Sequence, residues 1–169
     1  MKLGYTGLPG RGASDRFLAQ VVDGLAGRLR LCGTVQTNTA RADRRKCDMD
    51  VRLLSSGEVL RISEDRGAIA RGCTLDTGVL AQAVVVTEAA LPGADLLIVN
   101  KFGKTEAEGG GFAPVIGEAL CLDIPVLVGV NALNLRAFEA FSDGLAEALP
   151  ADLAEVRDWC LRAGLRHAA

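Results

Sequence analysis

Histidine is almost missing from this chain, since His167, near the C-terminal end, is the only one among 169 residues. The sequence therefore argues against catalysis by a histidine base and excludes metal sites built from several histidines. Aromatic residues are also scarce, at 4%, and the apolar fraction of 49% comes mainly from Ala, Leu and Val. This composition excludes a disordered chain and favours helices that pack on a sheet of small branched residues.

Strong charge of one sign is absent as well, because 19 basic and 21 acidic residues give a net charge of -2. A chain with this balance has no overall field that would attract nucleic acid or an anionic membrane, so we expect neither as a partner. The net charge does not exclude a local cluster of basic residues.

The five cysteines include no CxxC pair, and their odd number and wide spacing indicate reduced thiols. Cys47 and Cys73 have basic residues close by, which favours either a soft-metal or metalate ligand or the ordinary role of a small buried residue. For the other three we expect only the buried role: Cys32, Cys121 and Cys160.

Long hydrophobic runs are missing too, and the longest, near 81–86 and 96–99, fall well short of the ~20 residues of a membrane-spanning helix. The start MKLGYTGLPGRG reaches glycine and proline before the apolar segment of a signal peptide could form. We therefore expect a cytoplasmic protein without a membrane span. The length and the lack of a visible linker or repeat predict one domain over residues 1–169.

Strands and helices alternate along the predicted chain. Strands are predicted at 2–6, 31–36, 48–54, 58–63, 95–100 and 125–130. Helices are predicted at 14–29, with Ser14 as N-cap, at 75–91, with Asp76 as N-cap, and at 112–122, 133–149 and 151–163. Segment 37–46 is expected to be an exposed loop. This order predicts an α/β fold of three layers, with a mostly parallel sheet and the hairpin 48–63 as an antiparallel addition.

The segment GLPGRGAS at residues 7–14 matches the phosphate-binding spacing G-x-x-x-x-G-K-[ST], with Ala13 in the place of the lysine. In the complete motif, backbone N–H groups hold the phosphates, the lysine neutralises their oxygens and the hydroxyl binds magnesium. The motif predicts these ligand-binding residues: Gly7, Gly10, Arg11, Gly12, Ala13 and Ser14. The alternative is an ordinary turn between a strand and a helix.

A second motif follows the predicted strand 95–100, where P-loop enzymes carry an acidic strand end. Here the chain has Asn100 and Lys101. At this point it resembles the small P-loop nucleoside-triphosphatase family of thermophiles, which has a human cancer-related homologue. Gly103 and Glu106 match the motif of that family, whereas Asn100 and Lys101 replace its acids. The resemblance implies a P-loop NTPase-like fold over most of the chain.

A closer resemblance is to a bacterial family of unknown function that is often encoded near molybdate-transport genes. Its pattern is similar to Cys47-Asp48-Met49, Arg61-Ile62-Ser63, Gly72-Cys73-x-Leu75-Asp76 and Val99-Asn100-Lys101-Phe102-Gly103-Lys104-x-Glu106-Ala107-Glu108-Gly109. This gene neighbourhood implies a link to oxyanion or molybdenum metabolism and no particular activity.

The replaced acids make the strand end more positive by about three charges, which disfavours Mg²⁺ and favours an anion. Lys101 can take over the role of the missing loop lysine, because neighbouring strand ends point into one crevice. Lys104, beside it, is a further candidate for ligand binding, and Glu106 for positioning a water molecule. The plainer interpretation of both lysines is a solvated loop. No metal ligand set is predicted, and hydrolysis is expected to be slow or absent.

Three classes of function therefore stay open. The first is a nucleotide-binding or phosphate-binding P-loop protein with degenerate motifs, for which a nucleoside triphosphate is the candidate cofactor. The second is a non-enzymatic protein that binds an oxyanion of the molybdate or tungstate type, or a regulatory nucleotide. The third is a scaffold for a protein partner or a second copy of the chain.

Overall fold

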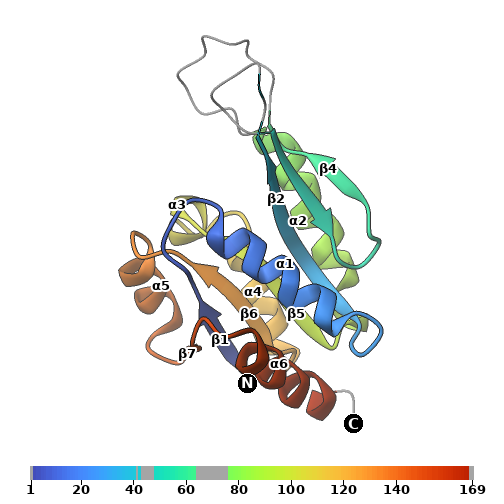
Figure 1. Cartoon of the computed structure of the whole chain (residues 1–169). Helices are drawn as coiled ribbons and strands as arrows, with labels where there is room; N and C mark the ends of the chain where they lie inside the picture. The colour runs from blue at the N-terminus through green and yellow to red at the C-terminus, as the bar shows by residue number, and fades with distance from the viewer. Residues whose placement is uncertain (1, 41, 43–47, 64–75, 168–169) are drawn as a thin grey trace.

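The protein was analysed as a computed structural model that describes residues 2–40, 42, 48–63 and 76–167. Its strands form a seven-stranded sheet in the order β4-β3-β2-β5-β6-β1-β7 (Figure 1). The strands are β1 (Leu3–Thr6), β2 (Leu31–Thr39), β3 (Asp48–Leu53), β4 (Val59–Arg61), β5 (Leu96–Phe102), β6 (Val126–Val130) and β7 (Glu147–Ala148). The helices are α1 (Ala13–Leu25), α2 (Thr77–Ala90), the 3-10 turn η1 (Leu91–Gly93), α3 (Lys104–Ala107), α4 (Ala113–Cys121), α5 (Leu135–Ser142) and α6 (Leu153–His167).

The sheet is parallel from β2 through β5, β6 and β1 to β7, and antiparallel where β3 pairs with β2 and with β4. The predicted α/β fold, with its mostly parallel sheet and antiparallel addition, is therefore confirmed. In Figure 1 the hairpin and the far half of β2 project from the body of the sheet as an arm.

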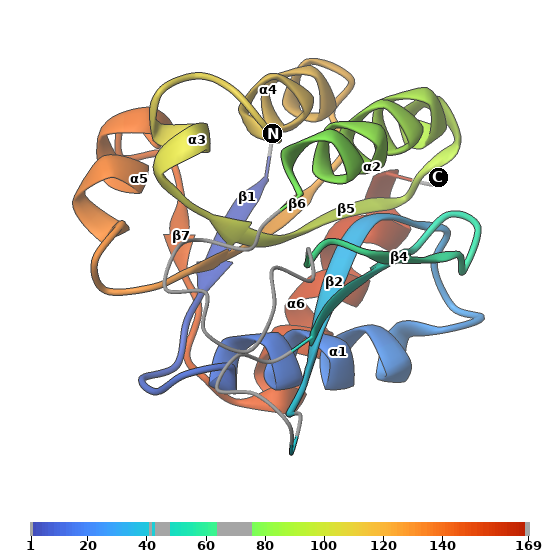
Figure 2. The same cartoon turned by 90° about the horizontal axis from the view of Figure 1, so that it is seen from above.

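Helices cover both faces of the sheet (Figure 2). Alternate residues of β5 serve the two cores: Leu97 and Val99 belong to one hydrophobic cluster, and Leu96 and Ile98 belong to the other. The first cluster lies beneath α2, α4 and α5, whereas the second lies beneath α1 and α6. This two-sided burial explains why the central strands are continuous apolar runs.

Strand β2 is longer than predicted, since residues 37–39 continue it in place of an exposed loop. Thr37, Asn38 and Thr39 pair with Asp50, Met49 and Asp48 of β3. These residues are polar and exposed, so they show no apolar alternation that would predict a strand, and the pairing with β3 decides their conformation.

Several predicted boundaries were wrong for identifiable reasons. The predicted helix 133–149 ends at Ser142, because Asp143 and Gly144 have left-handed φ angles of 48° and 71°. The chain then forms β7, which pairs with β1. Helix α1 ends at Leu25, short of residue 29, and the expected loop after β5 contains α3.

Two of the three cysteines expected to be buried are buried, Cys32 and Cys160, whereas Cys121 is exposed. Burial raises the pKa of Cys32 to about 11 and that of Cys160 to about 12, so both stay protonated and unreactive near neutral pH. Cys47 and Cys73 lie outside the described residues. No described helix has both the length and the apolar character to cross a bilayer.

Candidate functional site

A cavity of about 180 Å³ opens where the segment after β1 turns into α1, beside the carboxyl ends of β5 and β6. Carboxyl ends of parallel strands meet at one edge of a sheet, where α/β proteins bind their ligands. We call this space the loop cavity, and its lining residues are Leu8, Gly10, Arg11, Gly12, Ser14, Asp15, Asn100, Lys101, Gly129, Val130 and Asn131.

The backbone of the loop requires glycine at specific positions. A Cβ atom on Gly7 would lie 1.9 Å from the carbonyl oxygen of Val130, so the loop leaves β1 in direct contact with β6. Gly12 has a φ of 70° and precedes the first residue of α1, a conformation that L side chains rarely adopt. The glycine spacing therefore serves the shape of this loop.

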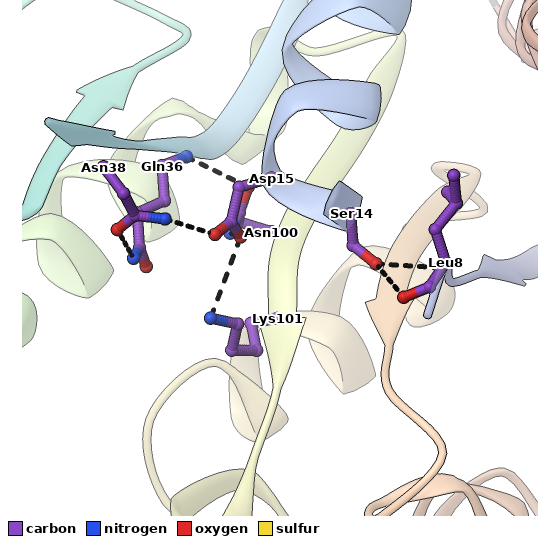
Figure 3. Close-up of polar contacts among 7 residues, drawn as sticks. All are labelled: Leu8, Ser14, Asp15, Gln36, Asn38, Asn100 and Lys101. Carbon is purple, nitrogen blue, oxygen red and sulfur yellow. Dashed lines mark hydrogen bonds and ion pairs between the residues drawn. The ribbon is translucent and has the colours of Figure 1, made fainter. Parts of the chain in front are cut away.

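The Ser14 side chain is hydrogen-bonded to the backbone of the loop. Its Oγ accepts a hydrogen bond of 2.9 Å from the Leu8 N–H and donates one of 3.3 Å to the Leu8 carbonyl oxygen (Figure 3). The predicted role as N-cap is wrong, because Gly12 occupies that position and Ser14 is the second residue of α1. The hydroxyl closes a ring across the loop.

Asp15 is the residue that sequence reasoning missed. This side chain is 4% exposed, and its carboxylate lies at the centre of a polar network (Figure 3). Oδ1 accepts a hydrogen bond of 2.8 Å from the Asn100 side chain, and Oδ2 accepts one of 2.6 Å from the Asn38 side chain. The network joins α1 to β2 and β5.

Gln36 fixes the orientation of this network through its backbone N–H and its side chain. The Asn100 Oδ1 accepts a 3.0 Å hydrogen bond from the Gln36 N–H, so the Asn100 amide nitrogen must face Asp15. The Gln36 side chain likewise donates to the Asn38 Oδ1 over 2.7 Å, which turns the Asn38 amide nitrogen toward Asp15. Two donors therefore converge on Asp15, the arrangement that an ionised carboxylate accepts.

Lys101 lies across the loop cavity from α1. Its Nζ is 3.7 Å from the Asp15 Oδ1, and the lysine side chain is 48% exposed. In the complete phosphate-binding motif the lysine comes from the loop and the acid from the strand. Here β5 supplies the lysine and α1 supplies the carboxylate.

The remaining predicted residues divide between two cavities. Gly10, Arg11, Gly12, Ser14, Asn100 and Lys101 line the loop cavity, whereas Gly7 and Ala13 are not among its lining residues. Gly103, Lys104 and Glu106 line a neighbouring cavity of about 230 Å³, which we call the α2 cavity. Asn100 and Lys101 belong to both walls.

Glu106 serves the backbone of its own segment. It is 6% exposed, and its Oε2 and Oε1 accept hydrogen bonds from the N–H groups of Gly103, at 2.9 Å, and Phe112, at 3.2 Å. This geometry ties the two ends of the 103–112 segment together. The expectation that Glu106 positions a water molecule stays a prediction that these contacts do not favour.

Lys104 is largely exposed, and among the described contacts it has none with the Asp15 network. Its side chain is 87% exposed, and its Nζ lies 3.6 Å from the Glu108 carboxylate one helical turn later. The described residues include no cluster of three or more His, Cys, Asp or Glu side chains that could hold a metal ion.

Two solved structures share this fold. THEP1 from the hyperthermophile Aquifex aeolicus superposes with a TM-score of 0.63 and 16% identity, covering 96% of this chain and 95% of that one. The human cancer-related nucleoside triphosphatase gives a TM-score of 0.59 and 14% identity, covering 99% of this chain and 97% of that one. These TM-scores show that the chain has the P-loop NTPase-like fold that the resemblance implied.

A curated relative is similar in sequence. The molybdenum import ATP-binding protein ModC 2 of Bradyrhizobium diazoefficiens is 31% identical over 131 residues. The match covers 77% of this chain and 15% of that protein, so the chain corresponds to a small part of its relative.

The family profile described as "Protein of unknown function (DUF2478)" matches residues 7–159, which include the loop cavity and nearly the whole sheet. The predicted membership of a bacterial family of unknown function is thereby confirmed: the chain belongs to the DUF2478 family.

Proposed function

We propose that this chain binds a phosphate group, free or as part of a nucleotide, in the loop cavity, and that it hydrolyses a bound nucleoside triphosphate slowly or not at all. The placement of Lys101 carries this proposal, because Lys101 lines the same cavity as the loop residues 10–12, and its Nζ lies 3.7 Å from the Asp15 carboxylate at the start of α1. Lys101 thus supplies from β5 the positive charge that Ala13 does not supply from the loop.

Three features of the loop cavity favour an anion. The first turn of α1 presents backbone N–H groups and the positive end of a helix dipole. Arg11 is an exposed lining residue and Lys101 is another, so the wall carries two positive charges against the single negative charge of Asp15. Arginine and lysine side chains bind phosphate oxygens through charge-assisted hydrogen bonds.

The same residues disfavour magnesium-dependent hydrolysis. Asn100 stands where P-loop enzymes have an acid, and its side chain is bonded to Gln36 and Asp15. The Ser14 hydroxyl donates to the loop backbone. Glu106 is bonded to backbone N–H groups. Each of these side chains is already held by contacts within the protein, which disfavours its use for binding magnesium or orienting water.

Direct binding of a tetrahedral oxyanion is the second candidate. The loop cavity, at about 180 Å³, is smaller than the ~300–1,000 Å³ of most small-molecule sites. A molybdate, tungstate or phosphate ion would fit without an organic part. The molybdenum import function named for the 31% identical relative points in the same direction.

A thermal-denaturation panel with phosphate, molybdate, ATP and ATP with Mg²⁺ tests the two candidates. A ligand at 100 times its Kd stabilises the fold by about 2.7 kcal/mol, which shifts the melting temperature measurably. We expect stabilisation by phosphate and ATP without added Mg²⁺, and little phosphate release from ATP. Stabilisation by molybdate alone would favour the second candidate, and no shift with any probe would favour a scaffold.

Replacing Asp15 with asparagine is expected to tighten the binding of inorganic phosphate about tenfold, equivalent to about 1.4 kcal/mol. The change keeps the shape of the side chain and removes the negative charge that faces the anion and neutralises Lys101. One of the two amide donors then loses its acceptor, so the free energy of unfolding should fall by about 1 kcal/mol. Calorimetric titration and urea unfolding measure the two effects. Weaker phosphate binding in Asp15→Asn would show instead that the carboxylate supports the ligand.

A further inference from the structure

The wall of the loop cavity beside α1 holds a cation and an anion close together. Lys101 and Asp15 both line the cavity, and the Lys101 side chain, which is 48% exposed, points toward the Asp15 Oδ1 from a distance of 3.7 Å (Figure 3). This separation is longer than the about 2.7–3.2 Å of a direct N–H···O hydrogen bond, so the pair does not use up the hydrogen-bonding capacity of either group. A ligand at this point therefore meets a donor and an acceptor at once.

The Asp15 carboxylate can only accept hydrogen bonds. Asn100 and Asn38 each donate to one of its oxygens, over 2.8 and 2.6 Å. An ionised carboxylate has about four acceptor sites and no proton to donate, so these contacts leave about half of its sites for a ligand. Gln36 holds both amides with their N–H groups toward Asp15, which keeps the carboxylate an acceptor.

Tetrahedral oxyanions differ in whether they carry a proton. Near neutral pH, free phosphate and arsenate keep at least one hydroxyl group, whereas sulfate and molybdate keep none. The hydrogen phosphate dianion and sulfate have the same shape and the same charge, so a cation and a helix end attract them about equally. A hydrogen-bond acceptor separates them, because the phosphate hydroxyl can donate to a carboxylate and every sulfate oxygen would face it with lone pairs.

We infer that Asp15 selects a protonated tetrahedral oxyanion in the loop cavity. Its Oδ1 accepts a hydrogen bond from the hydroxyl of hydrogen phosphate, and Lys101 donates to an unprotonated oxygen of the same ion. This inference rests on the proposed phosphate site and narrows its ligand to an oxyanion that carries a proton. It also gives the carboxylate a use at an anion site: a group that opposes every anion, but opposes the protonated ones least, lowers affinity and raises specificity.

Calorimetric titration of the full chain compares phosphate and arsenate with sulfate and molybdate, in a mildly alkaline buffer where free phosphate is mainly the dianion. The parent chain should bind phosphate about a hundredfold more tightly than sulfate, because a site that uses a hydrogen bond from the ligand rejects an analogue without the proton. Arsenate should follow phosphate and molybdate should follow sulfate, which separates the effect of the proton from that of ion size.

Asp15→Asn should reduce the preference for phosphate over sulfate to about tenfold or less. If phosphate affinity rises about tenfold, sulfate affinity should rise about a hundredfold, because an amide can donate to an unprotonated oxygen that the carboxylate repels. Asp23→Asn is the matched control, since it removes the same charge from the same helix, and Asp23 is 65% exposed and paired with Arg52. It should leave both affinities within about twofold of the parent.

Three results would overturn the inference and leave the proposed site standing. They are equal affinity of the parent chain for phosphate and sulfate, tighter binding of sulfate or molybdate than of phosphate, and a hundredfold preference for phosphate that survives in Asp15→Asn. The comparison of anions in the parent chain needs no substitution, so it decides the matter even if Asp15→Asn does not fold. Failure of all four anions to bind would remove the proposed site together with its selectivity.

Discussion

Replacing Lys101 with alanine is expected to weaken phosphate binding by about ten- to a hundredfold, or about 1.4–2.8 kcal/mol. Two effects act in the same direction. The ligand loses the lysine that β5 contributes to the loop cavity, and it then faces the Asp15 carboxylate without the cation 3.7 Å from it. Lys101 is 48% exposed, so solvent screening keeps the effect below that of a fully buried ion pair.

Lys104→Ala provides the matched control for this measurement. Lys104 lies three residues further on, is 87% exposed and pairs only with Glu108 among the contacts described. Its removal should change phosphate affinity less than about twofold, because exposed pairs of this kind contribute little. Equal losses in Lys101→Ala and Lys104→Ala would indicate a general effect of charge. Unchanged binding in Lys101→Ala would remove the proposal that this lysine replaces the loop lysine.

The double variant Asp15→Asn/Lys101→Ala separates the two effects. If the carboxylate opposes the anion, removing it should recover part of the affinity that Lys101→Ala loses. A double-mutant cycle then gives the coupling between Asp15 and Lys101, and residues in contact typically show about 0.5–3 kcal/mol. Strict additivity would mean that the ion pair has no role in ligand binding.

The parts of the fold that the sequence predicted are those with local causes. Asp76 caps α2 because its Oδ1 accepts hydrogen bonds from the Gly78 and Val79 N–H groups, an arrangement that the residue type alone suggests. The hairpin 48–63 was predictable for a similar reason, because its two strands are separated by the turn-forming residues 55–57. By contrast, β7 consists of Glu147 and Ala148, both exposed, and it exists only because β1 lies beside it. No local pattern signals such a strand.

The residues of the candidate site likewise include some that the sequence predicted and one that it did not. The spacing of residues 7–14 and the end of β5 were sufficient to predict that Lys101 and the loop line one crevice, as they do in the loop cavity. Asp15 could not be found in this manner, because its partners Asn38 and Asn100 are 23 and 85 positions away in the sequence. The contact with Asn38 also requires β2 to extend beyond residue 36, which depends on β3. The pairing of Lys101 on β5 with Asp15 on α1 thus emerges only from the packed sheet.

Gly7→Ala is expected to produce the largest loss of stability in the loop, about 3 kcal/mol, together with loss of phosphate binding. The added Cβ would lie 1.9 Å from the Val130 carbonyl oxygen, so either the loop or the end of β6 must move. Both segments line the loop cavity, and a displacement of either separates the backbone N–H groups from Lys101. Urea unfolding and calorimetric titration with phosphate measure the two consequences.

Gly10→Ala is the appropriate comparison, because no heavy atom lies within 4 Å of a Cβ built on Gly10, although its φ is 96°. The backbone penalty alone should cost about 1 kcal/mol, and most of the phosphate affinity should remain. Gly7 and Gly10 both belong to the predicted phosphate loop. Equal losses of stability and phosphate affinity at the two positions would mean that only the backbone cost of replacing glycine matters at either one. The larger loss expected for Gly7→Ala instead arises from the close approach of Gly7 to the Val130 carbonyl oxygen of β6. A Gly7→Ala protein with parental stability and phosphate affinity would show that the loop does not rest on Val130.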